Sequence, residues 1–226
     1  MIALFLLVAS VFSGVSILRI CRLEKGDSLV ILCRALGVGT LVATWTGYLV
    51  AFIVGLSPVV PLLSALITLY LGLAALLLEN RRRNREMSYS SSPATASRMS
   101  RLEEIPARLL LSLLILPFFV AGLRFSEKGD LIYSGYYVDM SYHLSVTGAF
   151  LEQYSVLPEN PFSPGRPLVY HYLINFHSAL LELGGMEPLA AQLVPQVLFA
   201  LSLIVGVVRY FRVFSGRAAF FSALLF

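Results

Sequence analysis

Two titratable side chains stand four residues apart at the start of a predicted helix. Asp139 precedes the helical pattern Met140–Tyr154 and His143 lies in its first turn, so the two can share one helix face. Carboxylate and imidazole groups are the usual participants in acid–base chemistry. A structural interpretation stands beside this one: Asp139 is well placed as the N-cap of the helix, and His143 as a group that orients it or packs at an interface.

A second predicted helix, Leu168–Leu183, follows a passage with four prolines that predicts a stiff, extended connector. Polar residues recur along this helix at helical spacing, opposite an apolar side that includes His177. This pattern predicts an amphipathic helix lying on a membrane surface, with His177 in a structural role. The polar stripe consists of His171, Asn175, Ser178 and Glu182.

Composition places these helices in a membrane protein. Of the 226 residues, 58% are hydrophobic and 13% are charged, whereas a soluble domain carries about 25% charged residues. A soluble enzyme and a nucleic-acid binder are therefore excluded, and the formal net charge of +4 needs no acidic partner. The two cysteines, Cys21 and Cys33, stand in no Cys/His cluster, so they predict neither a disulfide framework nor a structural metal site.

Apolar runs predict an all-α, polytopic protein with about five complete transmembrane helices and a truncated sixth. The predicted spans are Ile2–Leu18, Leu29–Leu56, Val59–Leu78, Leu109–Leu123 and Leu189–Val208, with Ala218–Phe226 as the start of a sixth. Since nine residues cannot cross a bilayer, we expect the chain to be a fragment. The predicted division is a three-helix unit (1–78), a basic, Ser-rich linker (79–107) and a second membrane unit (108–226).

Charge asymmetry predicts the orientation in the cell membrane. With the linker 79–107 in the cytoplasm, 14 basic residues lie inside and three outside, namely Arg124, Lys128 and Arg166. The N-terminus and the segment Phe125–Pro188 are then external. That segment holds seven acidic residues against two basic ones, as an outer loop should. Arg166 is the one basic residue in its middle and therefore a candidate for phosphate contact, or else a solvated loop arginine.

The order of these features resembles the start of the GT-C superfamily of membrane glycosyltransferases. An Asp opens an outer helix, a Pro-rich bend leads to Tyr170-His171-Tyr172 and a Gly184-Gly185 stop, and a span beginning Glu187-Pro-Leu-Ala-Ala-Gln-Leu follows. The superfamily includes protein O-mannosyltransferases, aminoarabinose transferases and oligosaccharyltransferase catalytic subunits. The resemblance covers about 108–226, and the sequence looks closest to a prokaryotic branch.

The resemblance implies transfer of a sugar from a polyprenyl-phosphate donor to a glycan, lipid or protein acceptor at the outer membrane face. Asp139 takes the position of the family's general base or ligand of a divalent cation (Mg or Mn), with His143 beside it. Arg166, Tyr170 and His171 are then candidates for substrate binding. Where many members carry a second acid, this chain has Met140 and Ser141, which weakens the metal interpretation.

Two other function classes remain open: a non-catalytic membrane subunit that shares the fold, and a transporter-type protein. A transporter predicts charged or broken helices at mid-membrane. Pro117 and Pro195 break predicted spans, but no acid or base lies near the centre of one. This distribution of charge argues against the transporter.

Overall fold

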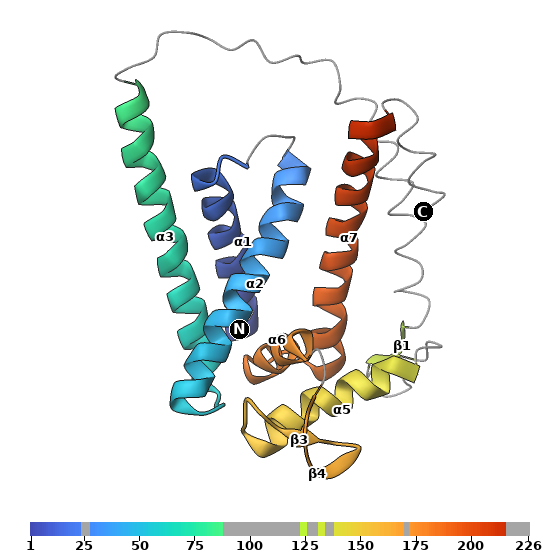
Figure 1. Cartoon of the computed structure of the whole chain (residues 1–226). Helices are drawn as coiled ribbons and strands as arrows, with labels where there is room; N and C mark the ends of the chain where they lie inside the picture. Colours follow the sequence, from blue (N-terminus) through green and yellow to red (C-terminus); the bar gives the residue numbers. More distant parts are fainter. Residues whose placement is uncertain (24–27, 88–122, 126–130, 134–137, 170–171, 216–226) are drawn as a thin grey trace.

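The structure is a computed structural model that describes residues 1–23, 28–87, 123–125, 131–133, 138–169 and 172–215. It is mostly helical. Four long helices run roughly along one direction, and two shorter ones lie across one end of them (Figure 1). The long helices are α1 (Ile2–Ile20), α2 (Ser28–Val54), α3 (Val59–Met87) and α7 (Pro188–Ser215); the short ones are α5 (Val138–Gln153) and α6 (Leu173–Leu183).

Four helices in the described part of the chain are long and apolar enough to cross a membrane. They correspond to the first, second, third and fifth predicted spans, so the membrane class is confirmed. Residues 109–122 of the predicted fourth span, and all of Ala218–Phe226, lie outside the described residues. The helix α3 continues nine residues beyond the predicted end of its span, from Leu78 to Met87.

Tight turns and close backbone contacts hold the first three helices together. Gly55, with φ of +79°, ends α2 in a left-handed conformation that costs glycine little. The chain re-enters helix at α3, where the Val60 amide donates to the Ser57 carbonyl at 2.9 Å. Between α1 and α2 the backbones approach so closely that a Cβ on Gly14 would stand 1.9 Å from the Ala35 carbonyl oxygen.

The helix α6 is built into the bundle. The Ala3 amide of α1 donates to the Gly184 carbonyl at its carboxyl end (3.0 Å). The Phe176 ring packs edge-on against Tyr48 of α2, with centroids 5.4 Å apart, and Leu180 fills the space beside Gly47. Every residue from Asn175 to Leu181 is buried. Contacts with α1, α2, α3, α5 and α7 therefore enclose this helix.

This burial corrects the prediction of a surface-lying amphipathic helix. Asn175 and Ser178, two members of the predicted polar stripe, are fully buried, because that side of α6 faces protein. The helix also begins at Leu173, five residues later than predicted. Glu182 is half-buried at its carboxyl end, and His171 lies outside the described residues.

The four-proline passage is not an extended connector. It folds back as a hairpin in which β3 (Glu159–Asn160) pairs antiparallel with β4 (Ser163–Pro167). The Asn160 side chain accepts from the Phe162 amide at 2.9 Å, which makes the tight turn. A second antiparallel pair joins β1 (Leu123–Phe125) to β2 (Leu131–Tyr133). The protein is thus mainly helical, with two short hairpins added to the predicted all-α fold.

Candidate functional site

His143 lies at the end of the bundle that α5 and α6 cross, and a buried amide fixes its ring. Its Nδ1 lies 2.9 Å from Oδ1 of Asn175 on α6. Because a carbonyl oxygen only accepts, Nδ1 carries the proton in this arrangement. The lone pair of a neutral ring is then on Nε2, which makes that nitrogen the one able to accept a proton.

The support for Asn175 extends to α7. The Thr147 hydroxyl of α5 donates to the backbone carbonyl of Asn175 at 3.4 Å. The side-chain amide of Gln192 on α7 donates to the Thr147 hydroxyl. The Gln192 amide also reaches the His143 carbonyl at 3.5 Å. Asn175, Thr147 and Gln192 are all buried. This polar network, defined by these three residues and His143, ties α5, α6 and α7 together around the imidazole.

Asp139 lies in the first turn of α5, which begins at Val138. Asp139 is therefore the second residue of the helix and not its N-cap. The backbone position places Asp139 one helical turn before His143, on the same side of α5.

Arg166 is exposed on β4, and a hydrogen bond and a ring contact attach its hairpin to α5. The Glu159 amide donates to the Gln153 side-chain carbonyl at 2.7 Å, and the Gly165 amide donates to the Glu159 carboxylate at 2.8 Å. The Phe162 ring at the turn stacks on Tyr142, with centroids 5.2 Å apart and planes 9° from parallel. Arg166 is thus carried on a fixed hairpin next to α5. Tyr170 and His171 lie outside the described residues.

Two carboxyl groups meet where α6 leads into α7. Glu187 caps α7, its two oxygens accepting from the amides of Leu189 (3.0 Å) and Ala190 (2.8 Å). Burial raises the pKa of Glu182 to about 7, and the nearby Glu187 charge adds to the shift. Glu182 therefore exchanges a proton near neutral pH. Sequence analysis placed it only in the polar stripe, since nothing local indicated its burial.

His177 takes the structural role predicted for it. It is buried, its Nδ1 lies 2.9 Å from the Thr44 hydroxyl of α2, and that hydroxyl donates to the Thr40 carbonyl. Burial lowers the pKa of His177 to about 4, so the ring is neutral at physiological pH. This histidine joins α6 to α2.

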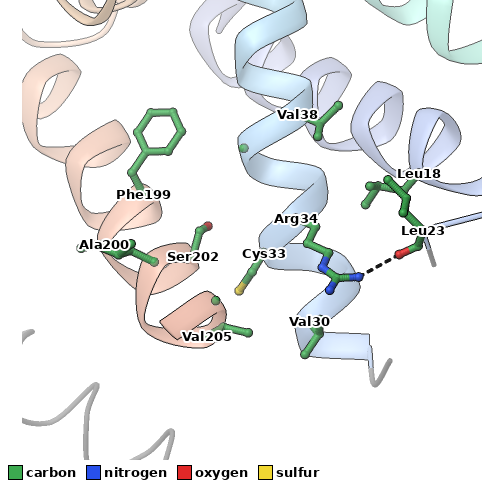
Figure 2. Close-up of a pocket in the computed structure, with 13 residues that line it drawn as sticks. Leu18, Leu23, Val30, Cys33, Arg34, Val38, Phe199, Ala200, Ser202 and Val205 are labelled. Carbon is green, nitrogen blue, oxygen red and sulfur yellow. Dashed lines mark hydrogen bonds between the residues drawn. The ribbon is translucent and has the colours of Figure 1, made fainter. Parts of the chain in front are cut away.

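A groove between α2 and α7 was not foreseen from the sequence. It encloses about 1010 Å³ near the opposite end of the bundle from α5 (Figures 1 and 2). Its walls are apolar apart from Arg34 and Ser202, and Arg34 donates to the Leu23 carbonyl at 3.0 Å. A second cavity of about 240 Å³ shares Gly37 and Phe199 with it and ends at His177.

No three His, Cys, Asp or Glu side chains among the described residues gather closely enough to hold a metal ion. The side chain of Asp139, the predicted ligand, lies outside the described part of the structure. Searches of protein-family models, of curated proteins and of solved structures each find no match for this chain.

Proposed function

We propose that this chain is a GT-C-like glycosyltransferase of the cell membrane, acting at its outer face on a polyprenyl-phosphate-linked sugar. The observation that carries the proposal is the polar network, which fixes the His143 ring one turn after Asp139 at the end of a membrane bundle. Buried polar groups are costly to retain, and here buried Asn175, Thr147 and Gln192 hold a partly exposed imidazole in one orientation.

In the proposed reaction, a hydroxyl of the glycan, lipid or protein acceptor attacks the anomeric carbon of the sugar. Asp139 takes the hydroxyl proton as the new carbon–oxygen bond forms. The bond from the anomeric carbon to the carrier phosphate breaks, and the phosphate leaves with the electron pair. His143 positions the carboxylate and the acceptor, while Arg166, with Tyr170 and His171, binds the phosphate.

The orientation is part of the proposal. The ends of α1, α2 and α3 that lie away from α5 and α6 (Figure 1) carry or adjoin basic residues: Arg19, Arg22, Arg34, Arg81 and Arg82. The positive-inside rule assigns that end to the cytoplasm. The proposed catalytic end then faces outward, where a polyprenyl-phosphate sugar presents its head group.

Cysteine labelling tests this orientation. In a background with Cys21→Ser and Cys33→Ser, a membrane-impermeant maleimide added to intact cells should label Ser163→Cys and leave Ser91→Cys unlabelled. Both variants should react after the cells are opened, which controls for accessibility. Labelling of Ser91→Cys alone in intact cells contradicts the orientation.

Activity is tested by transfer of radiolabelled hexose from polyprenyl phosphate, in membranes of cells that express this protein. Asp139→Asn keeps the size of the side chain, and we expect the rate to fall roughly 10²–10⁴-fold, the usual contribution of a general base. His143→Ala should have a smaller effect. Glu152→Gln, an exposed carboxylate on the same helix, is the matched control. An Asp139→Asn protein that works at the wild-type rate removes Asp139 from the mechanism.

A further inference from the structure

The groove between α2 and α7 has the form of a lipid-chain site. Its walls are side chains such as Val30, Val38, Phe199 and Val205, and Arg34 supplies the one charge among its described lining residues (Figure 2). The volume of about 1010 Å³ is at the upper end of the range for small-molecule sites. Water molecules find few hydrogen-bond partners in such a groove, because its lining is almost entirely apolar.

The length of the groove suits one acyl chain. On α2 it runs from Val30 to Val38, and the adjoining cavity continues to Thr44. From Arg34 to Thr44 there are ten residue steps, which correspond to about 15 Å at 1.5 Å per residue. One leaflet of a bilayer has a hydrocarbon depth of about 15 Å. A chain that starts beside Arg34 can therefore extend its full length between the two helices.

Arg34 has donors to spare for an anion. A guanidinium offers five N–H groups, and one of them donates to a described residue, from Nη1 to the Leu23 carbonyl at 3.0 Å. That bond holds the side chain at the mouth of the groove. No acidic residue is among the described groove walls. The charge is thus complementary to a negatively charged head group.

We propose that the α2–α7 groove binds an anionic phospholipid, with one acyl chain between the helices and the phosphate on Arg34. The head-group end of this site lies away from the network around His143, and the proposal does not depend on the proposed sugar transfer. Basic pockets between transmembrane helices are a recognised setting for anionic head groups.

Native mass spectrometry of the purified full chain in detergent tests the head-group contact. Dioleoylphosphatidylglycerol should remain bound, and dioleoylphosphatidylcholine should not. We expect Arg34→Gln to weaken the binding of the anionic lipid about tenfold, as loss of one charge-assisted contact does. Arg81→Gln is the matched control: it removes the same charge from the same end of the bundle, on α3 and outside the groove.

A second variant tests the acyl chain and leaves the charge in place. A Cβ on Gly37 meets no atom within 4 Å, so Gly37→Leu should fold normally and fill the groove beside Phe199. We expect it to displace the phospholipid although Arg34 remains. Gly148→Leu on α5 is the control, since its Cβ also meets no atom within 4 Å and it lies outside the groove.

Each outcome decides the proposal. Equal retention of both lipids, or unchanged binding in Arg34→Gln, overturns the head-group contact. The proposed acyl-chain site is overturned if Gly37→Leu binds the phospholipid unchanged, or if inorganic phosphate alone displaces the phospholipid. Either result leaves only a simple anion contact. Lipid binding is measured without sugar donor, so failure here is separable from failure of the transferase assay.

Discussion

The contact between α1 and α2 predicts a large difference between two neighbouring glycine substitutions. Ser10 and Gly14 on α1 stand four residues apart, and so do Ala35 and Gly39 on α2. A Cβ on Gly39 would lie 1.7 Å from the Ser10 carbonyl oxygen. Small residues at this spacing allow transmembrane helices to pack backbone against backbone.

The geometry gives the magnitude. Real Cβ atoms essentially never come within 3.0 Å of another atom, so raising the contact from 1.7 Å to 3.0 Å requires a shift of at least 1.3 Å. The obstacle in Gly39→Ala is backbone, which has no rotamer to change. Overpacking usually costs about 1–3 kcal/mol, and we expect the upper end. Gly37→Ala meets no atom within 4 Å and should gain up to about 1 kcal/mol of helix propensity.

Unfolding in mixed micelles with increasing sodium dodecyl sulfate measures this difference. Fluorescence of Trp45, the single tryptophan, reports on α2 directly. Gly39→Ala should unfold at clearly lower detergent fraction than the wild type, and Gly37→Ala at an equal or higher one. If the two variants unfold together, the close approach of α1 and α2 is wrong.

Three further predictions use the same unfolding assay. The folded-state pKa of Glu182 is about 7 against a model-peptide value of 4.5, so the folded state holds a proton that the unfolded state has lost. Stability should fall as pH rises from about 4.5 to 7, and Glu182→Gln should remove that slope. Gln192→Leu deletes the donor to buried Thr147 and should cost about 1–3 kcal/mol; a cost near zero contradicts the network. Glu187→Ala should cost about 1 kcal/mol through loss of the α7 cap, while Glu187→Asp should retain most of it.

Hydropathy predicted the long helices well because the hydrocarbon core selects for apolar residues at every lipid-facing position. It predicted the end of α3 less well. The apolar run stops near Leu78, yet the helix continues through Arg81 and Arg82 to Met87. Hydropathy marks where a helix leaves the hydrocarbon, whereas the backbone hydrogen bonds continue for as long as the residues tolerate helix.

The placement of α6 could not be read from its own sequence. Periodicity separates Asn175 and Ser178 from Phe176 and Leu180, but it does not say what covers either side. In the structure other helices cover both sides, and the polar one is satisfied partly by His143 of α5. The contact between α1 and α2, in contrast, is visible in the local sequence as pairs of small residues four apart, Ser10 with Gly14 and Ala35 with Gly39.

The candidate site depends on contacts between residues far apart in the sequence. The bond from His143 to Asn175 spans 32 residues, and it forms because the hairpin between α5 and α6 turns the chain back. The stacking of Phe162 on Tyr142 fixes that return. Proline fixes one dihedral angle but does not force a chain to stay extended, so four prolines are compatible with the turn. The spans are encoded locally, while the site proposed at the α5–α6 end of the bundle depends on how this one connector folds.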